Sequence, residues 1–221
     1  MINATALYRS TIGKKAIMAV TGIIGFFFVL GHMLGNLQAF PVFGGEAALN
    51  AYGEFLRSTH GLLWVVRFTL LMAVLLHIWA AYSLTRTSWA GRPQDYGRWK
   101  AVGSDYASRT MRWSGPILAL FIIYHLLDLT LGPTNPDFIE GEVYHNLVAS
   151  MQRWYISIFY VAAMVALGFH LYHGIWSMFQ SLGLNNPTYN RWLRRFAAAF
   201  TFIIAIGFVA VPIAVLMGVI S

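Results

Sequence analysis

Four histidines of this chain each lie inside a long apolar stretch, and imidazole is a side chain that binds metal ions and carries protons. The stretches FFFVLGHMLGN, MAVLLHIWAAY, LALFIIYHLLD and VALGFHLYHGIW contain His32, His77, His125 and His170. An ionisable side chain inside a bilayer is costly and rare, so it indicates a functional site. One such histidine in each of four stretches predicts a set of ligands.

The composition is that of a membrane protein. The 221 residues are 58% hydrophobic and 10% charged, whereas soluble domains carry roughly 25% charged residues. The net charge of +7 does not indicate a nucleic-acid partner, because the positive residues gather in particular connecting segments. The chain has no cysteine, which excludes disulfides, cysteine-bound iron–sulfur clusters and covalently attached c-type haem.

The apolar stretches predict an all-α fold, because about 20 apolar residues cross the hydrocarbon core as a helix. We expect one transmembrane domain over residues 1–221, with five spanning helices. The first stretch is too long for the apolar region of a signal peptide. Pro116 is expected in the first turn of the third helix, and Pro212 is expected to bend the fifth. The expected helices cover residues 16–40, 61–85, 113–131, 154–181 and 192–218.

Lysine and arginine predict the orientation of the bundle. Twelve of the fifteen lie in the N-terminal segment and in the second and fourth connections. By the positive-inside rule, the N-terminus is cytoplasmic and the C-terminus is outside. We therefore expect a multi-pass protein of a bacterial-type inner membrane, in contact with membrane lipid. The twelve residues are Arg9, Lys14, Lys15, Arg86, Arg92, Arg98, Lys100, Arg109, Arg112, Arg191, Arg194 and Arg195.

Depth divides the four histidines into two pairs. His32 and His125 lie about 8 or 9 residues from the outer ends of their helices, and His77 and His170 lie about 16 residues from theirs. At 1.5 Å per residue, these counts correspond to depths of roughly 12–14 Å and roughly 24 Å. We expect an outer pair from the first and third helices and an inner pair from the second and fourth.

Two histidines from different helices at one depth are the axial ligands that a six-coordinate b-type haem needs. Small residues lie near the histidines on their helix faces, where a flat macrocycle needs room. The alternatives are hydrogen bonding between helices and a zinc site, which would need ligands converging at one point. Two separate levels favour haem. The small residues are Gly35, Ala73, Ala80, Ala81 and Gly174.

The chain resembles the single-polypeptide, dihaem cytochrome b subunit that anchors succinate dehydrogenase and fumarate reductase in the membrane. The stretches STIGKKAIMAVTGIIGFFFVLGHMLGN and FHLYHGIWSMFQSLG resemble this family most closely. The resemblance implies that His77 and His170 bind the haem nearer the cytoplasm, and His32 and His125 the outer haem. His173 is then a neighbour of the haem. Some dihaem relatives have a glutamate, implicated in proton transfer, where this chain has Gly168.

The same resemblance implies partners and further cofactors. A flavoprotein subunit and an iron–sulfur subunit would dock on the cytoplasmic face, carrying the FAD and the clusters. Electrons would pass between succinate and a membrane quinone, with menaquinone expected by family analogy, or in reverse for fumarate reduction. The dicarboxylate chemistry would belong to the partner subunits.

Other polar residues are candidates for the surroundings of haem and quinone. Arg67 is expected near the outer haem's propionates, with snorkelling as the alternative, and Lys15, Arg109 and Arg112 near those of the inner haem. Quinone chemistry needs a proton donor near water, and the alternative for each donor candidate is a plain interfacial role. These donor candidates are Glu54, His60 and Asp128, whereas His145 is expected to be solvated.

Two rival functions remain open from the sequence. One is a cytochrome b anchor of another quinone-linked dehydrogenase, of the formate dehydrogenase or hydrogenase type. The other is a transporter without haem that uses its histidines as a proton relay. A bc-type cytochrome b fits less well, because it draws two histidines from each of two helices.

Overall fold

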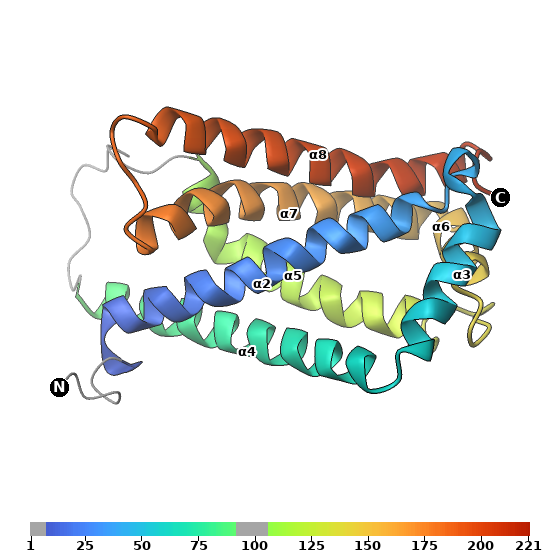
Figure 1. The fold of residues 1–221 in the computed structure, drawn as a ribbon, viewed down its shortest axis with the longest axis horizontal. Coiled ribbons are helices and arrows are strands. Elements are labelled where there is room, and N and C mark those ends of the chain that lie inside the picture. The colour runs from blue at the N-terminus through green and yellow to red at the C-terminus, as the bar shows by residue number, and fades with distance from the viewer. Residues whose placement is uncertain (1–7, 92–105) are drawn as a thin grey trace.

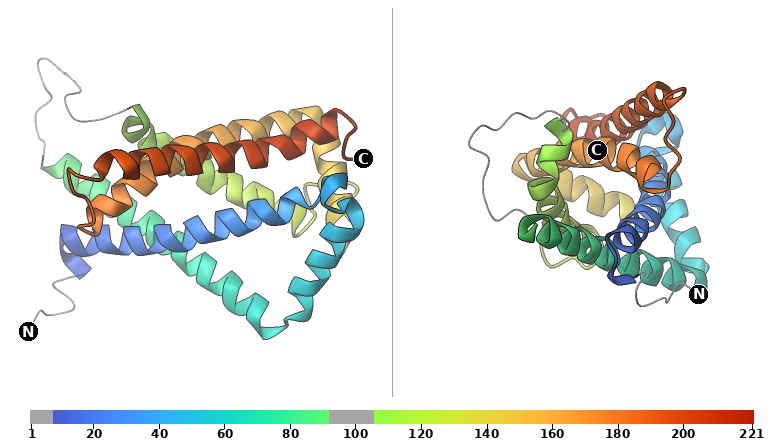
Figure 2. Two further views of the ribbon diagram at one scale, coloured as in Figure 1. Left: turned by 45° about the horizontal axis from the view of Figure 1, so that its top comes forward. Right: turned by 90° about the vertical axis from the view of Figure 1, so that its left-hand side faces the viewer.

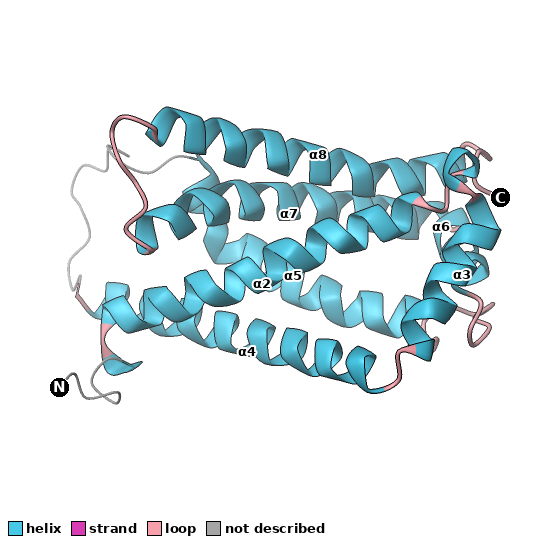
Figure 3. Ribbon diagram, viewed as in Figure 1, coloured by secondary structure: helices cyan, strands magenta, loops and turns pink. Residues whose placement is uncertain are grey.

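The computed structural model describes residues 8–91 and 106–221, and in these residues the regular structure is entirely helical (Figure 3). Five helices are long and apolar enough to cross a membrane. The predicted all-α, five-helix transmembrane bundle is therefore confirmed. Of the basic residues used for orientation, Arg92, Arg98 and Lys100 lie outside the described residues. The five helices are α2 (Thr11–Leu37), α4 (Gly61–Ala90), α5 (Tyr106–Leu129), α7 (Trp154–Ser181) and α8 (Asn190–Leu216).

Several helices extend beyond the apolar stretches that predicted them. The α5 helix begins at Tyr106 and not near residue 113, so Pro116 lies inside it and the expected first-turn position was wrong. Arg109 and Arg112 belong to this added length, because hydropathy detects only the part of a helix that lies in hydrocarbon. At the start of α2, the Ser10 hydroxyl accepts a hydrogen bond of 3.0 Å from the N–H of Gly13. This cap lengthens α2 toward the N-terminus.

The spanning helices pack in a defined order, which Figure 1 shows. The α7 helix packs against α5 and α8, and α2 packs against α4, α7 and α8. Where α2 meets α8, a Cβ added to Gly207 would overlap the side chain of Met33. Glycine at this position lets the two backbones approach closely, as small residues do between membrane helices.

The N-terminal half of α4 stands apart from the bundle. Figure 2 shows α4 diverging from α2 toward the end where it meets α3 (Gly45–Ser58). From Gly61 to Thr69 no residue of α4 is buried, whereas Ala73 and Ala80 further along are buried. The chain itself therefore buries α4 only in its middle part, at Ala73 and Ala80.

Short elements outside the spanning helices close one end of the bundle. The 3₁₀ helix η1 (Pro41–Phe43) and α3 follow α2, and α6 (Val143–Gln152) precedes α7. Gly44, with φ 109°, ends η1 and begins α3 in a left-handed conformation that favours glycine. Buried side chains of α3, α6 and α8 pack together here, including Leu49, Leu147, Met151 and Val215. These short elements were not predicted from the sequence.

Candidate functional site

The four intramembrane histidines come together as two pairs. The ring centroids of His32 on α2 and His125 on α5 lie 5.7 Å apart, with an interplanar angle of 87°. Those of His77 on α4 and His170 on α7 lie 6.1 Å apart, at 52°. These are the partners that counting residues along the helices predicted.

The spacing of each pair suits one metal ion between two imidazoles. Imidazole nitrogens bind metals at about 2.0–2.1 Å, which places two ring centroids about 6 Å apart when both rings bind one ion. Among the described residues no group of three or more His, Asp or Glu side chains is placed to hold a metal. A metal at either pair would therefore need other donors, and a porphyrin supplies four nitrogens.

Thr21 orients His77 of the inner pair. Its hydroxyl lies 3.0 Å from Nδ1 of His77 and within 2.8 Å and 3.1 Å of the carbonyl oxygens of Ile17 and Met18. The hydroxyl has one proton, which it donates to a carbonyl of its own helix, so it accepts from Nδ1–H of His77. This tautomer leaves Nε2 with a free lone pair, which is what a metal ligand requires.

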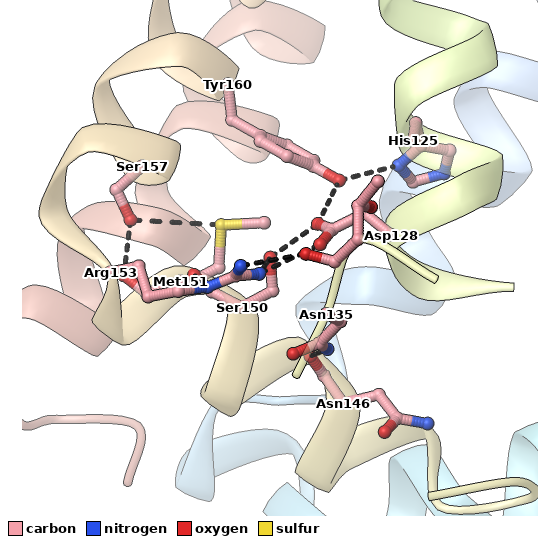
Figure 4. A network of polar contacts seen from close by, with 10 residues as sticks. His125, Asp128, Asn135, Asn146, Ser150, Met151, Arg153, Ser157 and Tyr160 are labelled. Carbon is pink, nitrogen blue, oxygen red and sulfur yellow. Dashed lines mark hydrogen bonds and ion pairs between the residues drawn. The ribbon is translucent and has the colours of Figure 1, made fainter. Parts of the chain in front are cut away.

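His125 of the outer pair is oriented through Tyr160, as Figure 4 shows. The Tyr160 hydroxyl lies 3.3 Å from Nδ1 of His125 and 2.9 Å from Oδ2 of Asp128. A carboxylate only accepts, so Tyr160 donates to Asp128 and accepts from Nδ1–H of His125. Nε2 of His125 is again left with its lone pair.

Asp128 is the centre of this polar network. It is fully buried near the end of α5, and its Oδ2 also accepts from the Ser150 hydroxyl at 2.5 Å. Its Oδ1 pairs with Arg153 at 2.9 Å. Arg153 lies between α6 and α7 and also donates to the carbonyl oxygen of Thr134 at 3.0 Å. A buried charge is stable only when it is paired and hydrogen-bonded, and Asp128 meets both conditions.

His170 has a different environment. Its Nδ1 is buried and has no hydrogen-bond partner among the described residues. A Cβ added to Gly174, one turn further along α7, would meet no atom within 4 Å. The side of α7 beside this histidine therefore has room that the chain leaves open.

Gly35 does not share this open space. A Cβ added to Gly35 would lie 2.8 Å from the ring of Tyr52, so Gly35 accommodates α3 and not a macrocycle beside His32. Ala73 and Ala80 are buried within α4. The structure therefore contradicts the expectation of room for Gly35 only, and for Ala73, Ala80, Ala81 and Gly174 it stays a prediction. Spacing of i+3 and i+4 identifies a shared helix face but not its neighbours.

Aromatic rings surround the outer pair. Phe28 stacks on His32 at 5.2 Å between ring centroids, and Phe121 stacks on His125 at 5.7 Å. Phe208 of α8 lies 5.9 Å from His32. The outer pair therefore has apolar surroundings except at Nδ1 of His125.

The basic candidates for haem propionates are all exposed. Arg67 lies over the ring of Trp64, Arg109 over Tyr106 and Arg112 over Trp89, at 5.1 to 5.8 Å from the guanidinium carbon to the ring centroid. Lys15 is exposed in the second turn of α2. None of the four is buried beside a histidine pair, although long basic side chains can reorient.

The quinone candidates do not form one cluster. Glu54 is exposed on α3, and His60 is exposed at the corner between α3 and α4, where its φ is 45° and its Nδ1 contacts the carbonyl oxygen of Ser58. Asp128 is buried in the network described above. His145, expected to be solvated, is half-buried on α6, with Nε2 2.9 Å from the carbonyl oxygen of Asp137.

Sequence reasoning missed Thr21 and Tyr160 as partners of the histidines. A spacing signal was present, because Thr21 precedes His32 by 11 residues and Tyr160 precedes His170 by 10. These spacings are close to three helical turns, so each helix presents a hydroxyl at one level and a histidine at the other. His173 and Gly168 lie on the same helix, and a Cβ added to Gly168 would lie 3.9 Å from side-chain atoms of Thr201 and Ala205 on α8.

Fold and site together define a multi-pass helical membrane protein that pairs histidines within its spanning bundle. The sequence profile described as succinate dehydrogenase/fumarate reductase transmembrane subunit matches residues 91–211, more than half of the chain. The chain belongs to this family, which confirms the predicted resemblance. The match contains α5 and α7, with His125 and His170, and α8 as far as Val211. No significant match to a curated protein or a solved structure was found.

Members of this family are membrane anchors of cytochrome b type that generally bind haem and quinone. They belong to a complex with flavoprotein and iron–sulfur subunits. The protein is therefore a membrane subunit of the succinate dehydrogenase/fumarate reductase family.

Proposed function

We propose that this chain is a dihaem b anchor that passes electrons between an iron–sulfur subunit and membrane quinone. The observation that carries the proposal is the presence of two histidine pairs at metal-bridging spacing, each drawn from two different helices. His32 and His125 hold the outer haem, and His77 and His170 hold the inner haem. When bound, haem supplies an iron centre that takes up and releases one electron.

The residues of the chain hold and isolate the two centres. Thr21 and Tyr160 select the Nδ1–H tautomers of His77 and His125, which leaves Nε2 as the nitrogen that would bind iron. Phe28, Phe121 and Phe208 keep water from the outer pair. Gly174 leaves room beside His170 for part of the inner macrocycle. His173, Lys15, Arg67, Arg109 and Arg112 are proposed as surroundings of the haems, the last four through their propionates.

The orientation and the partners are part of the proposal. The N-terminus lies in the cytoplasm and the C-terminus outside, in a bacterial-type inner membrane. The flavoprotein and iron–sulfur subunits dock on the basic cytoplasmic side, and the inner haem lies nearer to them. Menaquinone is the proposed quinone. Of the predicted proton donors, Glu54 and His60 are exposed and reachable, whereas the buried, triply hydrogen-bonded Asp128 favours a role in positioning.

Purification of the intact complex from membranes tests this proposal. We expect a reduced-minus-oxidised spectrum of b type after dithionite, about two haems per copy of this chain, and a copurifying flavoprotein with covalent or tightly bound FAD. A colourless preparation would contradict the proposal and favour the proton-relay transporter. Copurification of a formate dehydrogenase or a hydrogenase instead of a flavoprotein would favour the rival anchor function.

A further inference from the structure

The two histidine pairs differ in the polar group that holds one member of each. His125 is linked through Tyr160 to the carboxylate of Asp128, with distances of 3.3 Å and 2.9 Å (Figure 4). His77 is linked to the Thr21 hydroxyl at 3.0 Å. Thr21 donates its proton to a backbone carbonyl. His77 therefore donates to a neutral hydroxyl that is not itself bonded to a charged group.

The two hydrogen bonds that link His125 to Asp128 through Tyr160 both donate toward the carboxylate. The Asp128 carboxylate accepts from Tyr160, Ser150 and Arg153 and has no proton of its own to give. The proton of Tyr160 therefore points to Asp128, and the Tyr160 oxygen presents its lone pair to Nδ1–H of His125. Hydrogen bonds to a charged acceptor are roughly twice as strong as neutral ones, and successive bonds polarise one another. His125 is thus a better electron donor at Nε2 than an imidazole whose hydroxyl partner is not bonded to a charged group.

Arg153 does not cancel this effect at His125. It contacts Oδ1 of Asp128, whereas Tyr160 contacts Oδ2. Its other hydrogen bonds go to the carbonyl oxygens of Thr134 and Ser150 and to the Ser150 hydroxyl, away from the histidine. Arg153 pairs with Asp128 inside the protein, and Tyr160 carries the influence of the carboxylate to the imidazole.

We propose that Tyr160 and Asp128 are positioning residues that lower the reduction potential of the outer haem by strengthening electron donation from His125. A more basic imidazole and a nearby negative charge both stabilise the oxidised iron more than the reduced iron. This inference rests on the proposed function, because it requires haem at His32 and His125. No proton or atom is transferred, and the network acts on a single one-electron couple.

A redox titration of the intact complex in membranes tests this inference, with the absorbance of the two haems fitted as two components. Tyr160→Phe removes one oxygen atom and breaks the link between His125 and Asp128. We expect the potential of one component to rise while the other stays unchanged and the haem content per chain is preserved. Asp128→Asn keeps the shape and removes the charge, and the same component is expected to rise.

Two control variants separate this effect from general disturbance. Tyr124→Phe makes the same chemical change on α5 at a ring that lies 6.3 Å from Tyr160 between centroids, and it is expected to shift neither component. Thr21→Val removes the hydroxyl beside His77, and any shift it causes must fall on the component that Tyr160→Phe leaves unchanged.

The outcomes distinguish this inference from the function on which it rests. Absence of haem in the wild-type complex would overturn the proposed function and the inference with it. Two bound haems with unchanged potentials in Tyr160→Phe and Asp128→Asn would overturn the inference alone. Loss of the outer haem from both variants would also overturn it, because the network would then be needed for the pocket and not for the potential.

Discussion

At the scale of single residues, hydroxyl groups decide which nitrogen is available in His77 and His125. Thr21 and Tyr160 occupy Nδ1 of His77 and His125, whereas Nδ1 of His170 is buried without a partner among the described residues. An unsatisfied buried polar atom costs about 1–3 kcal/mol, so its presence in a native structure calls for an explanation. A ligand role through Nε2 would fix the ring of His170 but leave Nδ1 without a partner, so the bond to the metal would have to offset the cost at Nδ1.

Substitution of single histidines tests the assignment of ligands. We expect His77→Ala to lose the inner haem and retain the outer one, because only the inner pair loses an axial ligand. Haem per chain should fall by about half, measured by the reduced spectrum of the purified complex. His173→Ala is the matched control, since it removes a neighbouring histidine of α7 and should keep both haems. Loss of haem in His173→Ala but not in His170→Ala would reverse the assignment on α7.

The sequence allowed the histidine pairs to be placed, because depth depends only on counting residues along helices of known direction. It did not allow the partners of the histidines to be identified. Arg153 stands beside Trp154 at a predicted helix start, and nothing in its sequence position indicates that it reaches back to Asp128 on α5. Gly35 has the spacing of a residue beside the ligand and instead accommodates Tyr52. Contacts between helices depend on rotation about the helix axis, which counting does not provide.

At the scale of secondary-structure elements, Asp128 and its partners join α5 to the segment between α6 and α7. The two residues of the ion pair are 25 positions apart in sequence. Hydrogen bonds from Ser150 of α6 and Tyr160 of α7 to the same carboxylate reinforce this connection. Breaking a buried ion pair by removing one partner costs about 3–5 kcal/mol, because the remaining charge is left uncompensated. Arg153 is therefore a sensitive point at the end of the bundle that α3 and α6 close.

We expect Arg153→Met to lower the stability of the protein by about 3–5 kcal/mol, since it leaves Asp128 buried and unpaired. The double variant Arg153→Met/Asp128→Asn should recover much of this loss, because it removes both charges. Unfolding in detergent, followed by circular dichroism, measures the stability of both variants. A double variant that is less stable than Arg153→Met would show that the carboxylate is stabilised without the arginine.

Gly35 and Gly174 allow two roles of glycine to be compared, close packing of helices and space for a cofactor. Gly35→Val places its side chain against Tyr52 and should destabilise the packing of α3 on α2 by about 1–3 kcal/mol. Gly174→Val meets open space in the chain itself, so helix content should be kept while the inner haem is lost. Thermal unfolding and haem content separate the two effects. Full haem content in Gly174→Val would contradict the placement of the inner macrocycle beside this residue.

At the scale of the whole molecule, composition and hydropathy were sufficient to predict a five-helix membrane bundle. They were not sufficient to predict α3 and α6, because these short helices mix apolar and polar residues and are stabilised by packing against the ends of the spanning helices. The expected start of α5 was too late for a related reason, since its first turns carry Arg109 and Arg112. Hydropathy detects contact with lipid and does not detect where a helix begins.

The charge distribution predicts the orientation of the whole chain, and reporter fusions can measure it. Alkaline phosphatase fused after Ser221 should be active, because this enzyme folds only outside the cytoplasm, and green fluorescent protein at the same place should be dark. The positive-inside rule predicts this result from the twelve basic residues of the N-terminal segment and of the second and fourth connections. An inactive phosphatase and a fluorescent protein fusion would place the basic connections outside the cytoplasm, and the docking face would then lie outside as well.

The pairing of Asp128 with Arg153 also bears on how the protein is made. The carboxylate emerges from the ribosome with α5, before its counter-charge, which follows 25 residues later. Until then α5 offers the translocon a helix with an unpaired acid near its end, which lipid accepts poorly. The α5 and α7 helices are therefore expected to leave the translocon as a joined hairpin. A nascent chain truncated after α5 should integrate inefficiently, and Asp128→Asn should restore its integration.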